Sequence, residues 1–203
     1  MTVFIPFGKD CSPAFILRYA ELRKESLPFD WNLAYAQHIK RSFDVKFEDW
    51  FTDIELIYHD GLVPDAVQER TTNKCSTINH NYPISQIDHP GLGFIAHFDL
   101  TDPTVVETIK KRIKRFYEII SSDEDIVFFS SSSYEDLDKH GLLNYFNRDA
   151  KTSFLFLDYK ISNKKNISID EVNGYKIIRA NATHSFDHDM FHAIANTVKS
   201  LYI

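Results

Sequence analysis

The sequence predicts one α/β domain over residues 1–203: an open, mainly parallel, Rossmann-like sheet flanked by helices. Short apolar runs alternate with amphipathic stretches from end to end, which is the pattern of successive βα units. No linker rich in Pro, Gly or Ser and no internal repeat divides this alternation. The 203 residues, 43% of them hydrophobic, suffice to bury most of the apolar surface in a single core.

The first strand and helix are marked by their residue types. Residues 3–7 form a short apolar run, which predicts a buried strand. A helix is then expected over 13–23, with Ser12 as its N-cap and Pro13 at its first position. Cys11 lies between the two elements, so a thiol is expected at the start of a helix.

The next elements are expected from helical spacing. Apolar residues at steps of three and four favour helices at 33–43 and at 47–58. Residues 60–90 show little periodicity and many polar side chains. We expect this segment to be an irregular excursion with room for a short strand or two.

The second half of the chain alternates strands and helices more regularly. Short apolar runs predict strands at 93–98, 126–129, 153–158 and 175–179. Helical spacing predicts helices at 104–121, 137–146 and 187–202. The clearest is 104–121, because its apolar stripe lies opposite a face rich in Lys and Arg.

Composition and charge exclude several classes of protein. A net charge of −6 argues against a nucleic-acid partner, because binding phosphates requires an excess of Lys and Arg. Two cysteines give no disulfide framework and suggest a cytoplasmic setting. No N-terminal signal pattern and no apolar run near the roughly 18 residues of a membrane span is found. We expect no membrane span and no cofactor.

The expected sheet points to where a site would lie. In open parallel sheets ligands bind beyond the carboxyl ends of the strands. The segments that follow the expected strands are Gly8–Ser12, His97–Asp99, Ser130–Ser133, Asp158 and Asn181–His184. We therefore expect Cys11 to belong to this edge. The serine run there is either a phosphate-binding loop or a solvated one.

Cys11 is the candidate nucleophile. A thiol at a helix N-terminus faces unpaired N–H groups and the positive end of the helix dipole, which favour the reactive thiolate. His97 is the expected base, and Asp99 shares its face in an extended chain. The N–H groups of Ser12 and Ala14 are candidates for an oxyanion hole. The alternative is structural: a small buried thiol and a packed histidine.

The C-terminal segment offers two further interpretations. Asp189 and His192 have the D-x-x-H spacing found late in GDSL/SGNH-type hydrolases, and form an alternative base pair for Cys11. His184, His188 and His192 recur at four-residue steps that suit a divalent metal on a helix. The alternative is that the aspartates simply complement the helix dipole, and we expect no bound metal.

Several motifs resemble those of a known family. Four lie close together near the N-terminus: Phe7–Cys11, Leu17-Arg18, Leu22–Ser26 and Pro28–Trp31. Further along the chain are His97 with Asp99, and the basic run Lys111–Phe116. Together they resemble a family of bacterial and viral domains of unknown function described as papain-like cysteine peptidases. The resemblance implies that Cys11 and His97 are the catalytic pair, with Asp99 or Asp30 as the orienting acid.

Two enzyme classes follow as hypotheses. The first is a cysteine-dependent hydrolase acting on a small-molecule, peptide or glycan substrate. The second is a glycan-assembly enzyme, such as a nucleotide-sugar-dependent glycosyltransferase, in which Cys11 only lines the pocket. A non-catalytic binding module is a third possibility. For the enzymes the expected substrate-binding residues are Ser12, Trp31, Arg112 and Arg115.

Overall fold

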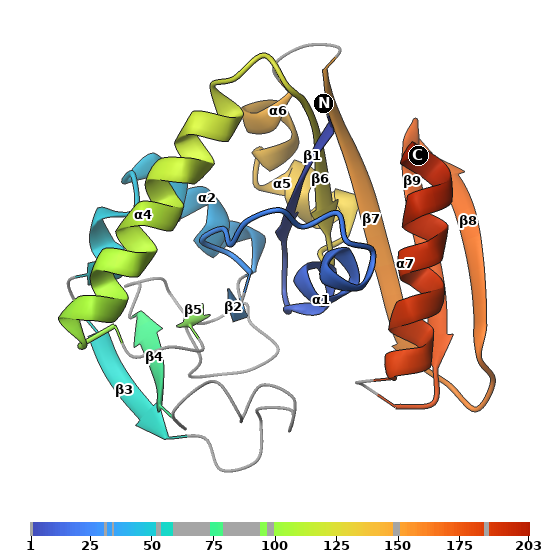
Figure 1. Ribbon diagram of the computed structural model, residues 1–203, viewed down its shortest axis with the longest axis horizontal. Helices are drawn as coiled ribbons and strands as arrows, with labels where there is room; N and C mark the ends of the chain where they lie inside the picture. The colour runs from blue at the N-terminus through green and yellow to red at the C-terminus, as the bar shows by residue number, and fades with distance from the viewer. Residues whose placement is uncertain are drawn as a thin grey trace.

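A five-stranded sheet forms the centre of the computed structural model, which describes residues 2–30, 32–33, 35–51, 54–58, 74–78, 94–96, 100–147, 151–184 and 187–203. The strand order is β1-β6-β7-β9-β8 (Figure 1). The first four of these strands run parallel, and β8 pairs antiparallel with β9. Their bounds are β1 Thr2–Phe7, β6 Asp125–Ser130, β7 Thr152–Ile161, β9 Tyr175–Ala182 and β8 Asn166–Val172. The predicted open, mainly parallel α/β sheet is confirmed.

Helices cover both faces of this sheet (Figure 1). One face packs against α2 (Ala36–Asp44), α4 (Pro103–Ile120), α5 (Tyr134–Lys139) and α6 (Leu142–Phe146). The other face packs against α1 (Ser12–Tyr19) and α7 (His188–Tyr202). Alternate residues of each strand point to opposite faces of the sheet. Phe128 and Phe156 pack on the first face, and Phe129 and Leu157 pack on the second. We call these the α4 face and the α7 face.

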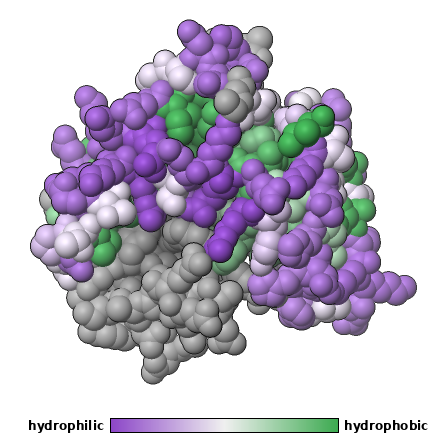
Figure 2. Space-filling model, viewed as in Figure 1, coloured by the Kyte–Doolittle hydropathy of each residue, from purple (hydrophilic) through white to green (hydrophobic). Residues whose placement is uncertain are grey.

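The helix predicted at 104–121 is confirmed as α4. Its apolar stripe is buried in the α4 face through Ile109, Ile113 and Phe116. Figure 2 shows mainly hydrophilic residues on the outer surface of this helix, as the predicted basic face requires. The side chain of Asp102 accepts a hydrogen bond from the Thr104 N–H at 2.8 Å and caps the helix. No helix among the described residues combines the length and apolar character needed to cross a bilayer.

A second, four-stranded sheet contains residues from two predicted elements, the helix at 47–58 and the strand at 93–98. Its order is β2-β5-β4-β3, all antiparallel, with β2 Asn32–Leu33, β5 Phe94–Ala96, β4 Lys74–Ile78 and β3 Ile54–Tyr58. The helix predicted at 47–58 is wrong: a 3₁₀ turn over Glu48–Phe51 precedes β3. Positive φ angles at Lys46 and Phe47 end the helical path, and pairing with β4 overrides the local pattern. The strand predicted at 93–98 exists as β5 but lies in this second sheet.

Three other helices differ in their bounds from the predictions. The first helix begins one residue early, so that Cys11 and not Ser12 is its N-cap, and it ends at Tyr19. Leu33 lies in β2, so the second helix starts later than predicted. Gly141, with φ +71°, breaks the predicted helix 137–146 into α5 and α6.

Strand β8 was not predicted, because most of its side chains are polar or exposed. The dipeptide Asn173-Gly174 gives the signal for it. Both residues have positive φ, 54° and 81°, which is the pattern of the type I′ turns that join hairpin strands.

Gly8 permits the closest backbone approach at the carboxyl edge of the sheet. Its φ is +132°, which L side chains rarely adopt. A Cβ atom added there would lie 2.5 Å from Ser131 Oγ and 2.7 Å from Ser131 N. The turns that follow β1 and β6 therefore meet with no room for a side chain.

We expect Gly8→Ala to lower the free energy of unfolding by about 2 to 5 kcal/mol, because backbone strain and overpacking act together. Gly174→Ala is the matched control. Gly174 also has positive φ, but no atom lies within 4 Å of its would-be Cβ, so we expect a loss of only about 1 kcal/mol. Urea unfolding of both variants measures the difference, and equal losses would contradict the close approach.

Candidate active site

Two turns meet at the carboxyl edge of the main sheet. The turn after β1 carries Cys11, and the turn after β6 is the serine run that begins at Ser130. The Ser131 N–H donates to the Phe7 carbonyl oxygen at 3.2 Å, and the Asp10 N–H donates to Ser131 Oγ at 3.2 Å. These bonds hold the Cys11 turn against the serine turn.

Cys11 is buried on the α7 face. Its side chain packs with residues of α1 and α7, and the residue is 7% exposed. Burial, and after it the neighbouring Asp10 carboxylate, raise the pKa of the thiol to about 12, although a backbone hydrogen bond partly opposes them. The prediction that the helix start favours the thiolate is wrong, because burial of the thiol is the largest cause acting on its pKa and favours the protonated form.

The amides beside Cys11 differ in availability. The Ser12 N–H donates to Asp10 Oδ1 at 2.8 Å, so it is already engaged. Pro13 has no N–H. No acceptor among the described residues is found for the Ala14 N–H. Of the two amides expected to form an oxyanion hole, only that of Ala14 lacks an acceptor among the described residues, and Ala14 itself is buried.

Asp30 and one of the predicted arginines, Arg112, come together with Arg23 in a buried charge cluster. Asp30 is fully buried, pairs with Arg23, and accepts a hydrogen bond from the Leu27 N–H at 3.0 Å. Burial raises the pKa of Asp30, and Arg23 opposes that shift. Burial likewise lowers the pKa of Arg112, and Asp30 opposes it. The carboxylate thus faces cations from two segments, the one after α1 and the helix α4.

Arg115 holds the same loop from outside. Its Nη1 donates to the Ser26 carbonyl oxygen at 2.9 Å, and its guanidinium pairs with Glu25. The described contacts of Asp30, Arg112 and Arg115 are therefore with the loop between α1 and α2.

The alternative base pair lies at the far end of α1 from Cys11. The His192 ring packs on Tyr19, with ring centroids 4.2 Å apart. Cys11 and Tyr19 are eight residues apart, about 12 Å along a helix axis. The Asp189 side chain is 93% exposed and pairs with Lys165 at 3.6 Å. The structure does not bring Cys11, His192 and Asp189 together.

The predicted histidine cluster has other contacts. His188 Nδ1 lies 2.6 Å from the Tyr19 hydroxyl. Asp187 caps α7 through the Met190 N–H at 3.1 Å, as the dipole interpretation predicts. In the part of the chain that the structure describes, no group of three His, Cys, Asp or Glu side chains could hold a metal ion.

Three predicted site residues, Trp31, His97 and Asp99, lie outside the described residues. His97 was expected at the same edge as Cys11 because it ends a strand of the parallel sheet. That strand is β5, which belongs to the second sheet. Position at a common sheet edge therefore gives no support for the pairing of His97 with Cys11.

A cavity of about 290 Å³ opens beside the serine turn, on the α4 face. Asp158 and the serines had been placed at this edge from sequence. Lys9 lies within the Gly8–Ser12 segment expected at this edge, whereas sequence reasoning missed Glu135 and Arg179. The lining residues are Lys9, Ser131, Ser132, Ser133, Tyr134, Glu135, Phe156, Leu157, Asp158, Val172, Ile177 and Arg179.

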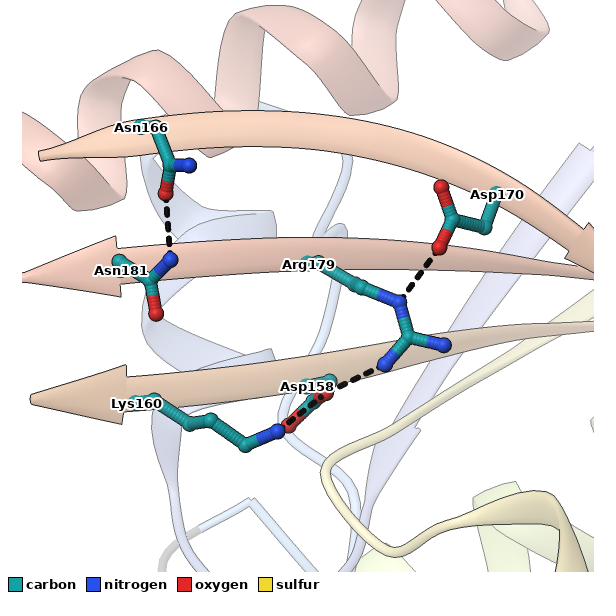
Figure 3. Close-up of polar contacts among 6 residues, drawn as sticks. All are labelled: Asp158, Lys160, Asn166, Asp170, Arg179 and Asn181. Atoms are coloured by element: carbon teal, nitrogen blue, oxygen red, sulfur yellow. Dashed lines mark hydrogen bonds and ion pairs between the residues drawn. The ribbon is translucent and has the colours of Figure 1, made fainter.

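Arg179 organises one wall of this cavity (Figure 3). Its Nη1 donates to Asp158 on β7 at 2.8 Å, and its Nε donates to Asp170 on β8 at 2.5 Å. Lys160 adds a second donor to Asp158 at 3.0 Å. The wall is thus built from paired charges on three adjacent strands.

Comparison with known proteins gives two matches. Residues 2–163 match a family described as “Putative papain-like cysteine peptidase (DUF1796)”. The chain is also 32% identical over 139 residues to “Uncharacterized protein R408” of Acanthamoeba polyphaga mimivirus. That alignment takes in 63% of this chain and 60% of the relative, so the chain spans less than two thirds of the viral protein's length.

No solved structure matches the chain. The family match covers most of the chain, including the turn with Cys11, α4 and the serine turn. It confirms the resemblance seen in the N-terminal motifs. The chain belongs to the papain-like cysteine peptidase family of that description.

Proposed function

We propose that this protein is a cysteine-dependent hydrolase of peptide substrates, with Cys11 as its nucleophile. The observation that carries the proposal is the position of Cys11. It follows the turn after β1, at the carboxyl edge of the sheet, and begins α1. Membership of a family described as peptidases supports the reaction class and the choice of peptides.

The thiol requires a base. With a pKa of about 12, Cys11 is almost wholly protonated at neutral pH. The proposed enzyme therefore works by general-base activation at the moment of attack, and not through a thiolate already present in the free protein. We propose His97 as that base, with Asp99 as its orienting acid. Asp30 suits this role less well, because it is fully buried and its Oδ2 already pairs with Arg23 and the Leu27 N–H.

The proposed reaction balances as an ordinary acyl transfer. His97 accepts the thiol proton as the Cys11 sulfur attacks the carbonyl carbon of the peptide bond. The Ala14 N–H stabilises the oxyanion. His97 then gives its proton to the leaving amine, and the carbon–nitrogen bond breaks to leave a thioester. Water, activated by His97, hydrolyses the thioester and restores the thiol.

Substrate contacts are proposed for the residues on either side of the turn. Ser12 follows the nucleophile, and Trp31 follows the buried Asp30. Arg112 and Arg115 are proposed to act through the loop that ends at Trp31, because their described partners lie in it. They position that loop on α4.

Cys11→Ala is expected to reduce hydrolysis of an internally quenched peptide library by about a thousandfold or more, because the nucleophile is lost. His97→Ala should cost about a hundredfold or more. Cys75→Ala is the matched control and should retain activity. If Cys11→Ala keeps full turnover while a nucleotide diphosphate raises the melting temperature, the glycosyltransferase hypothesis replaces this one.

The resting thiol can be tested separately in the Cys75→Ala background, where Cys11 is the one cysteine left. With its pKa near 12, the iodoacetamide rate should rise about tenfold per pH unit through the neutral and mildly alkaline range. An ordinary thiol would level off near a pKa of about 8.5. Mass spectrometry of labelled protein measures the rate. A plateau at or below neutral pH would show a preformed thiolate and contradict general-base activation.

A further inference from the structure

The cavity beside the serine turn is separate from the Cys11 thiol. It forms where β6 ends at Ser130 while β7 and β9 continue as a pair to Ile161 and Ala182. Phe156 and Ile177, which line it, belong to the α4 face of the sheet. Cys11 belongs to the α7 face. The two sites therefore lie on opposite faces of one sheet.

Ser132 lacks a partner inside this cavity. The residue is only 3% exposed, and its Oγ makes no hydrogen bond with any of the described residues. A buried hydroxyl left unpaired costs free energy, so such a group needs an explanation. Neighbouring Ser131, equally buried, does have partners, because its Oγ accepts from the Asp10 N–H. Ser132 Oγ is therefore available to form a hydrogen bond with a molecule bound in the cavity.

The charged side chains that line the cavity include equal numbers of cations and anions. Lys9 and Arg179 are cationic, and Glu135 and Asp158 are acidic. A phosphate group would meet two carboxylates at once, which disfavours an anion. A cation would meet two basic side chains. The cavity therefore suits an uncharged ligand that can both donate and accept hydrogen bonds.

Donors and acceptors also alternate along the strands next to the cavity (Figure 3). Arg179 uses Nε and Nη1 on Asp170 and Asp158, and its other terminal nitrogen bears no contact in Figure 3. Asn181 and Asn166 pair at 2.5 Å on the same face. Each of these groups can form a hydrogen bond with a ligand hydroxyl while keeping its present partner.

We propose that this cavity binds a small, uncharged, hydroxyl-rich molecule of the monosaccharide class. A hydroxyl both donates and accepts hydrogen bonds. The several hydroxyls of one ligand therefore pair with Ser132 Oγ, donate to Asp158 or Glu135, and accept from Lys9 or Arg179. The volume of about 290 Å³ lies at the lower limit for drug-sized ligands and suits one sugar ring. Phe156 and Tyr134 supply apolar surface for the ring. This site does not depend on the hydrolase proposal.

The test is ligand-observed NMR of the full chain with a panel of neutral probes: glucose, galactose, mannose and N-acetylglucosamine. Inorganic phosphate and glycine serve as anionic and zwitterionic comparisons. We expect at least one sugar to give a saturation-transfer signal that Ser132→Ala abolishes. Ser200→Ala, on the exposed side of α7, should leave the signal unchanged. Cys11→Ala should also leave it unchanged, so failure of either proposal can be told from failure of the other.

Melting temperatures separate a ligand contact from a structural role. Removing an unpaired buried hydroxyl should leave the melting temperature of ligand-free Ser132→Ala equal to or above that of the parent protein. Ser131→Ala, which removes a partnered hydroxyl, should lower it. The proposal is overturned if no sugar binds, if sugars bind Ser132→Ala as well as the parent, if only phosphate or glycine binds, or if Ser132→Ala melts clearly below the parent.

Discussion

The close approach of Gly8 to Ser131 is the constraint on which both candidate sites depend. With no side chain at Gly8, the turn after β1 rests directly on the backbone of the serine turn. That contact directs the chain into α1 and so places Cys11 on the α7 face. It also fixes Ser131 and Ser132 at the mouth of the cavity on the α4 face. One backbone contact thus positions two sites that share no side chain.

The charge cluster around Asp30 joins parts of the chain that are distant in sequence. Asp30 and Arg23 belong to the connection between α1 and α2, whereas Arg112 belongs to α4. A buried carboxylate is tolerated only with such partners, because desolvation strongly disfavours an isolated charge. Arg23 and Asp30 come from the Leu-Arg and Pro-Phe-Asp-Trp motifs. Their place in this charge cluster gives both motifs a structural role, in addition to any catalytic role. The cluster thus ties the connection between α1 and α2 to α4.

Local residue patterns predicted the buried strands β1, β6, β7 and β9 and the helix α4, because their apolar runs and stripes are decided by burial. They failed for β3, whose apolar residues match helical and strand spacing alike. They failed for β8, an edge strand with little apolar surface. The state of the Cys11 thiol depends on how deeply other segments bury it, and the cavity depends on strands that end at different heights. Neither property is local, so neither could be predicted from sequence.

The four parallel strands β1, β6, β7 and β9 follow one another across the sheet in chain order, and the antiparallel strand β8 lies at the edge beyond β9. Such a sheet lacks the crevice that diverging loops form where strand order reverses. The cavity arises instead because β6 ends before β7 and β9 do, so two of its walls are hydrogen-bonded strands. A ligand would meet a surface that is already formed, and little entropy would be lost in ordering it. Selectivity at this place would rest on the fit to fixed strand positions, and changes to loop sequences elsewhere would alter it little.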